Sequence, residues 1–217
     1  YRGEERARQA AVDKIRTYVG NQLNSYTAAM ASSTLIQAET DIKNYVDSNP
    51  ERNRLREDEA KALYNSIASH FVQLRVTRKS EAKKFKGSIN DRLSSELKED
   101  MTLAQLNDAA ANLINNINAS PYLETDIKDG LKVSVNKRVN AIYSTKQQNY
   151  IGYIMNQLID YDGTDPLTTL NEKEAELKAT VDNLDLKEED KTSLKTLLTN
   201  HFKILRGAQQ VEIEEFN

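Results

Sequence analysis

The two histidines are the first candidates for chemistry, because the chain of 217 residues has no cysteine and no other imidazole. His70 precedes Phe71, and His201 precedes Phe202. A catalytic or metal-binding pair would have to converge on one point. Neither an HExxH motif, a cysteine cluster nor an EF-hand loop accompanies them. We therefore expect both histidines to be structural, each beside a core phenylalanine, and we expect no catalytic residue, metal or cofactor.

A run of basic residues is the sharpest surface feature of the sequence. It consists of Arg75, Arg78, Lys79, Lys83, Lys84 and Lys86. Such a run could bind a phosphate-rich or polyanionic partner. Phe85 is the one aromatic residue beside it, so a platform for stacking bases is lacking. The alternative is the solvated face of a long helix. We keep these six residues as a candidate patch for an anion or a partner.

Two polar groupings have a structural interpretation that competes with a functional one. Residues 161–165, Tyr-Asp-Gly-Thr-Asp, could bind a cation, but they lack the alternating carboxylates of a calcium loop. We expect a turn in which Gly163 relieves backbone strain. Tyrosines 18, 26, 153 and 161 could form a contact surface for a partner. We expect them instead to lie near the end of the first helix of each copy and to pack against the loop that leads to the second helix.

Composition indicates an all-α protein and narrows the classes of partner. The chain is 38% hydrophobic and 29% charged, with only 7 glycines and 3 prolines. Its net charge of -3 provides no global field for nucleic acid or an anionic membrane. No apolar run is long enough to cross a bilayer. We expect a protein partner, with no nucleic acid, no small-molecule substrate and no membrane insertion.

An internal repeat positions these residues. Most landmarks between Tyr18 and Asp47 return with constant spacing between Tyr153 and Asp182. The pairs include Tyr18 and Tyr153, Leu23 and Leu158, Leu35 and Leu170, Glu39 and Glu174, Lys43 and Lys178, and Val46 and Val181. Further on, His70-Phe71 and Arg75 return as His201-Phe202 and Arg206. A fainter copy lies between them, in which Phe85, Ile89 and Leu93 repeat Ile15, Val19 and Leu23. The sequence therefore predicts three units of three helices, residues 1–75, 76–144 and 145–217.

The ends of the predicted helices follow from capping and breaking residues. Four capping boxes are expected, Thr34 with Gln37, Thr102 with Gln105, Thr169 with Glu172, and Asp185 with Glu188. No proline lies between Leu55 and Leu97 or between Tyr122 and Tyr161. The third helix of each unit is therefore expected to continue into the first helix of the next. The expected fold is an elongated rod of three small three-helix bundles on shared helices. If Gly87 and Gly152 bend these helices, the alternative is one globular bundle with a pocket.

This plan resembles that of spectrin-like repeats, although the units are shorter and lack a core tryptophan. Tandem three-helix modules in the stalks of Gram-positive surface proteins are nearer in size. The resemblance is architectural and implies no activity. We expect a non-enzymatic spacer, stalk or protein-binding scaffold within a longer surface or structural protein. An extracellular, cell-surface or virion location is slightly favoured over a cytoplasmic one. The alternative function is a ligand-sensing helical ectodomain of a membrane receptor.

Overall fold

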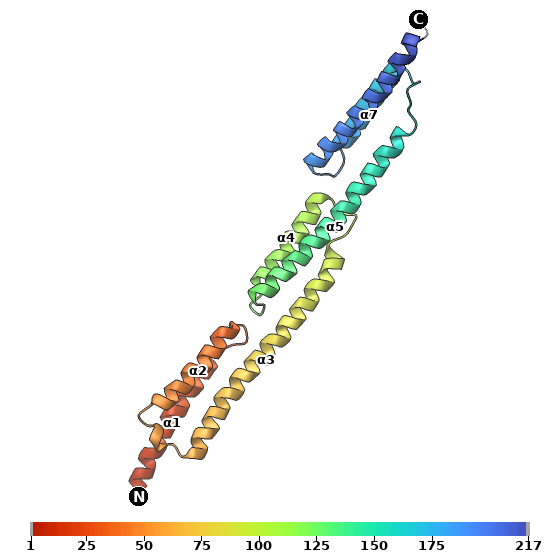
Figure 1. Ribbon diagram of the computed structural model, residues 1–217. Helices are drawn as coiled ribbons and strands as arrows, with labels where there is room; N and C mark the ends of the chain where they lie inside the picture. The colour runs from red at the N-terminus through yellow and green to blue at the C-terminus, as the bar shows by residue number, and fades with distance from the viewer. Residues whose placement is uncertain (1, 216–217) are drawn as a thin grey trace. The chain divides into compact units, whose positions relative to one another are not determined.

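The computed structural model describes residues 2–215, and the side chains as far as residue 208. These residues form seven α-helices and a short 3-10 helix, without a strand among them (Figure 1). The helices are α1 (Arg2–Asn24), α2 (Ser32–Ser48), η1 (Arg52–Arg54), α3 (Glu57–Glu96), α4 (Leu103–Ala119), α5 (Thr125–Leu158), α6 (Leu167–Asp182) and α7 (Glu188–Glu215). The all-α expectation is confirmed. Tyr1 and residues 216–217, the outer ends of the first and third predicted units, lie outside the described residues.

Two long helices cross the predicted joints between units. Helix α3 has 40 residues and passes through Gly87, and α5 has 34 residues and passes through Gly152. None of the described glycines has a positive φ, and the helical assignment is unbroken at both positions. Packing and hydrogen bonding offset the cost of about 1 kcal/mol that glycine imposes on a helix. The expected continuity of these two helices is confirmed.

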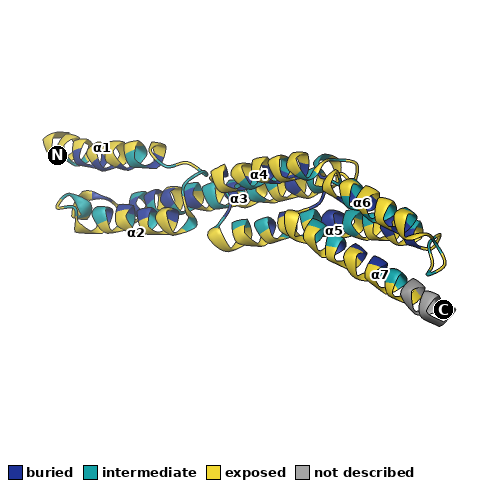
Figure 2. Cartoon of the chain, turned by 90° about the horizontal axis from the view of Figure 1, so that it is seen from above, coloured by how far each residue is buried: buried dark blue, intermediate teal, exposed yellow. Residues whose placement is uncertain are grey.

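The chain divides by packing into two compact units. Unit 1 comprises Tyr1–Arg92 and Ile114–Lys132, and unit 2 comprises Leu93–Leu113 and Val133–Asn217. Each unit holds a hydrophobic cluster. In unit 1 the cluster runs from Val12 on α1 to Phe71 on α3, and in unit 2 from Tyr143 on α5 to Phe202 on α7. Most helices bury a single stripe and expose the rest, as amphipathic helices of small bundles do (Figure 2).

The helix starts agree only in part with the expected capping boxes. Thr102 and Gln105 form one before α4. The Gln105 backbone N–H donates to Thr102 Oγ1 at 3.2 Å, and Gln105 Oε1 accepts from the Thr102 backbone N–H at 2.9 Å. The box expected at Thr34 is wrong, because α2 already begins at Ser32 and the Gln37 amide donates to Asp41.

The other two capping boxes are also wrong. Helix α6 begins at Leu167, directly after Pro166, so Thr169 lies inside the helix. Proline before the first helical residue fixes φ without losing a needed donor. The Asp185 carboxylate accepts hydrogen bonds from Leu103 and Lys146 and is not used as a local cap.

The loop at residues 161–165 forms the expected turn. Asp162 Oδ1 accepts from the backbone N–H and the hydroxyl of Thr164, at 2.8 and 2.6 Å. These bonds lower the pKa of Asp162. The reason given for Gly163 is wrong, since its φ is not positive. A Cβ at this position would lie 3.0 Å from the Cβ of Ala208, so Gly163 allows the loop to approach α7 closely.

Candidate interaction surface on helix α3

Helix α3 carries all six residues of the predicted basic patch. Its buried stripe in unit 1 includes Leu63, Ile67 and Phe71, each one helical turn after the last, and Ile89 about five turns further on. The patch therefore lies on a helix whose rotation about its axis is fixed by packing. The side chain of each basic residue therefore lies either on the buried side of α3 or on its exposed side. The six residues differ in this respect.

Arg75 is held by an ion pair with α2. Its Nη1 donates to Glu39 Oε2 at 2.7 Å, and Lys43 Nζ donates to Glu39 Oε1 at 2.7 Å. Burial alone would raise the pKa of Glu39, but the hydrogen bonds from Lys43 and Arg75 outweigh it, and the pKa is lowered. Arg75 therefore contributes to the packing of α2 on α3.

The same triad occurs in unit 2. Arg206 Nη1 donates to Glu174 Oε2 at 2.7 Å, and Lys178 Nζ lies 2.6 Å from Glu174 Oε1. These three residues are the repeat counterparts of Arg75, Glu39 and Lys43, and here too the pairing lowers the pKa of the glutamate against the effect of burial. A feature present in both copies belongs to the bundle plan, so Arg75 is not specific to a patch.

Arg78 is not on the surface at all. It is only 5% exposed, and its guanidinium binds two loops that lie far apart in the sequence. Nη1 donates to the carbonyl oxygens of Met30 at 2.8 Å and Pro121 at 2.7 Å, with longer contacts to Ala28 and Ala29. Five donors in a fixed fork allow one arginine to serve several carbonyls and a carboxylate together. The prediction that Arg78 belongs to an exposed patch is wrong for this reason.

Glu124 completes the network around Arg78. Its Oε1 accepts from Arg78 Nη2 at 3.0 Å and from the Ser32 hydroxyl at 2.9 Å. The bond from Ser32, followed by that from Arg78, lowers the pKa of Glu124 despite partial burial. One carboxylate thus links the start of α2, the middle of α3 and the loop before α5. We name this cluster of Ser32, Arg78, Glu124 and the four loop carbonyls the joint network.

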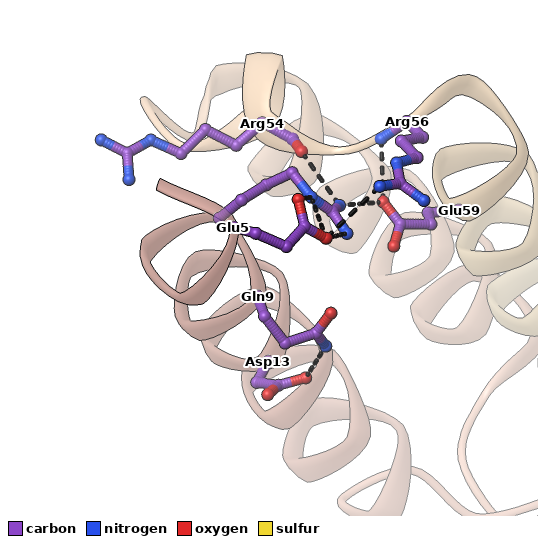
Figure 3. Close-up of polar contacts among 7 residues, drawn as sticks. Glu5, Gln9, Asp13, Arg54, Arg56 and Glu59 are labelled. Atoms are coloured by element: carbon purple, nitrogen blue, oxygen red, sulfur yellow. Dashed lines mark hydrogen bonds and ion pairs between the residues drawn. The ribbon is translucent and has the colours of Figure 1, made fainter. Parts of the chain in front are cut away.

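Sequence reasoning missed Ser32 and Glu124, although one signal pointed to Arg78. Arg78 precedes Phe85 by the same interval as Arg8 precedes Ile15, so the two arginines are repeat counterparts. Arg8 binds Glu59 at 2.7 Å and contacts the carbonyl oxygen of Arg54, the last residue of η1. Arg54 and Glu59 are labelled in Figure 3. An arginine at this position therefore binds the loop before the third helix of its own predicted unit in both copies.

Unit 2 has related contacts made by other residue types. The counterpart of Arg8 and Arg78 is Tyr143, whose hydroxyl donates to Asp190 and accepts from the backbone N–H of Lys187. Burial, together with the bond to Asp190, raises the pKa of Tyr143 to about 12. Beside it, Lys146 donates to Asp185 at 2.8 Å, and the same carboxylate accepts from the backbone N–H of Leu103.

All four lysines of the predicted patch are exposed. Lys84 forms an ion pair with Glu81 at 2.7 Å. Lys79, Lys83 and Lys86 form no hydrogen bond or ion pair with another side chain among the described residues. They follow Val72 and Val76, which are 50% and 56% exposed, at intervals of four, three, four and three residues. This spacing places the five side chains on one face of α3. We call them the α3 stripe.

The histidines lie where the repeat predicts, beside Phe71 and Phe202. Each imidazole meets its phenylalanine edge-on, with ring centroids 5.6 and 5.7 Å apart. Both Nε2 atoms are buried without a hydrogen-bond partner among the described residues. Among those residues no group of histidine and carboxylate side chains could hold a metal ion. Tyr26 and Tyr161 also pack on the same two phenylalanines.

No family model, no curated protein and no solved structure matches the chain. Across the part of the chain that the structure describes, no helix is long and apolar enough to cross a membrane.

Proposed function

We propose that this chain is a non-enzymatic helical-repeat module that acts as a spacer or stalk and as a scaffold for protein binding. In this proposal the three predicted units form an elongated rod of small bundles on shared helices, as part of a longer surface or structural protein. Its mechanism is geometric. Shared helices resist bending, and exposed helix faces offer binding surfaces along the length.

The joint network is the observation that carries this proposal. Arg78 lies on α3 where the first predicted unit ends and the second begins, and it binds carbonyl oxygens at Met30, from the first unit, and Pro121, from the second. A continuous helix alone would leave both loops free to move at this position. A buried arginine that binds both loops supports a joint built to hold its geometry, because leaving buried acceptors without their donor costs about 1–3 kcal/mol.

Small-angle X-ray scattering on the purified chain tests the spacer proposal. A compact globule of this length has a radius of gyration of about 17 Å. We expect a value well above this, with a distance distribution that extends to a long maximum. A compact value would overturn the proposal.

Hydrogen exchange tests the role of the joint network separately. Arg78→Met keeps much of the side-chain volume but leaves the loop carbonyls without their donor and Glu124 with Ser32 as its one remaining donor in the network. We expect faster amide exchange in the loops at residues 25–31 and 120–124, with a loss of about 2 kcal/mol in stability. Lys84→Met is the matched control, since Lys84 is exposed on the same helix. Unchanged loop protection in Arg78→Met would show that the network does not hold the joint.

A further inference from the structure

We propose that the α3 stripe is a docking site for an acidic, amphipathic helix of a partner protein. The stripe consists of Val72, Val76, Lys79, Lys83 and Lys86. This inference rests on the proposed scaffold function and names the chemistry of the partner.

The spacing of the stripe favours a helical partner. Intervals of four and three residues are those of a heptad seam, which a second helix covers along its length. From Val72 to Lys86 the seam is about 21 Å long at 1.5 Å per residue. The inner side of α3 is already used by Phe71, Arg78 and Ile89, which are buried. The stripe is therefore a second, separate face of the same helix.

The positive charge at the C-terminal end of the stripe indicates where the partner helix carries negative charge. Lys79, Lys83 and Lys86 lie one helical turn apart in succession on this face. The nearest acidic residue of the same segment, Glu81, is paired with Lys84. Glu39, beside Arg75, is already bound by two cations. A partner helix with carboxylates at matching positions would supply the missing negative charge.

The apolar end of the stripe favours a protein over a simple polyanion. Val72 and Val76 are half exposed and lie one turn apart on the same face, so they adjoin one another instead of being scattered singly. Ile36 on α2 is 56% exposed and precedes Glu39 by one helical turn. Glu39 binds Arg75, which lies between Val72 and Val76 in the sequence. A polyanion such as a sulfated glycan would leave these side chains uncovered. An amphipathic helix would cover them with its own apolar residues.

The other long helices lack this arrangement. At the repeat counterparts of Val72, Lys83 and Lys86, helix α5 has the uncharged residues Asn140, Gln148 and Ile151. At the counterparts of Val72 and Val76, α7 has Lys203 and Gly207. The bundle plan therefore does not require the stripe. It is specific to α3, as a binding site for one partner would be.

The test uses a designed peptide as the probe and the full chain as the receptor. The peptide is a labelled helix of about three heptads, with leucine at the first seam positions and glutamate at the later ones. We expect it to bind with a Kd of about 10–100 µM by fluorescence anisotropy. Lys79→Glu, Lys83→Glu and Lys86→Glu together should weaken binding at least about tenfold, and so should Val72→Gln with Val76→Gln.

Controls separate a specific site from general electrostatics. Lys14→Glu, Lys61→Glu and Lys203→Glu change the net charge equally at exposed positions outside the stripe, and should leave the affinity within about twofold. Circular dichroism should show that every variant keeps its helix content. A peptide with the same composition but scrambled heptads should bind at least about tenfold more weakly.

Several outcomes would overturn the proposal. Absence of peptide binding would do so, as would equal losses in the stripe and control variants. If heparin or anionic vesicles bind and the valine variant binds them equally well, the partner is a polyanion or a membrane. If sedimentation shows a dimer that the stripe variants abolish, the partner is a second copy. None of these results depends on scattering, so failure of the docking site is distinguishable from failure of the spacer proposal.

Discussion

The two hydrophobic clusters use the same repeat positions but differ in how many of these positions hold an apolar side chain. One cluster lies on α1, α2 and α3, and the other on α5, α6 and α7. Both bury the counterparts Leu35 and Leu170, and both place Phe71 or Phe202 at 0% exposure. Leu55 and Leu186 occupy the same position before the third helix and are both buried. The helical stripes and the closing leucine are thus common to both copies.

The copies differ at the edge of the core. Val12, Ile15, Ala38 and Ala60 belong to the first cluster. Their counterparts in the other copy are Gln147, Tyr150, Lys173 and Lys191. Tyr150 is partly buried against the second cluster, whereas the other three form polar contacts. Gln147 donates to Asp190, and Lys173 lies 5.7 Å from the centre of the Tyr161 ring. The fold therefore tolerates polar groups at the edge if each finds a partner.

Removal of the central phenylalanine should have the largest effect in both regions. Phe71→Ala and Phe202→Ala each delete a fully buried side chain, and each should cost about 3–5 kcal/mol. Because the cluster on α5, α6 and α7 holds fewer apolar side chains, we expect Phe202→Ala to release α6 and α7 at a lower urea concentration. Hydrogen exchange read out by mass spectrometry locates the loss. Equal protection of α2 and α6 in the unaltered chain would contradict this ranking.

Loss of the shared ion triad should cost less, and equally in both copies. Glu39→Gln and Glu174→Gln remove a carboxylate that binds two cations, and each should cost about 1–2 kcal/mol at neutral pH. The pKa of each glutamate is lowered from 4.5, so its contribution is present above that pH. Stability should therefore fall as the pH drops through the lowered value. Urea midpoints at pH 7 and at about pH 3 measure this, and the variants should lose less on acidification than the unaltered chain.

An exchange at one edge position should separate the two copies. Lys173 covers Tyr161 and pairs with Glu176, whereas Ala38 leaves a surface hollow beside Tyr26. Lys173→Ala should cost about 0.5–1 kcal/mol through loss of the cation–π contact. Ala38→Lys should cost more, about 1–3 kcal/mol, because Ala38 is buried in the first cluster and a lysine there overpacks it. Thermal melts of both variants provide the comparison, and a loss in Ala38→Lys no larger than that in Lys173→Ala would show that the two edges are interchangeable.

A substitution at a fully exposed position should have the smallest effect on stability. Ile204 is 71% exposed on α7, and its counterpart on α3 is Gln73. Ile204→Gln should change stability by no more than about 0.5 kcal/mol. A loss above about 1 kcal/mol, measured by urea denaturation, would mean that Ile204 is buried in solution.

Much of the fold could be predicted because its signals are local or repeated. The intervals between Leu63, Ile67 and Phe71 identify a buried helical stripe, and the lack of proline predicts that α3 continues through Gly87. The spacing of Thr102 and Gln105, three positions apart, predicted a capping box, and the two reciprocal hydrogen bonds form. The capping box expected at Thr34 does not form, because α2 begins earlier, at Ser32. The Ser32 hydroxyl donates to Glu124, a residue 92 positions away.

The candidate site was predicted as a run of six basic residues, and the sequence alone could not divide it. Helical spacing determined which residues share a face, so the alignment of Lys79, Lys83 and Lys86 was available from the sequence. The burial of Arg78 was not, because its partners Met30, Pro121 and Glu124 lie more than 40 residues away in the chain. The sequence by itself determined the helices, their apolar stripes and the continuity of α3, since neighbouring residues control these. The tertiary structure alone decided which cations hold the bundle and which remain exposed to a partner, because only folding brings distant carbonyls and carboxylates to them.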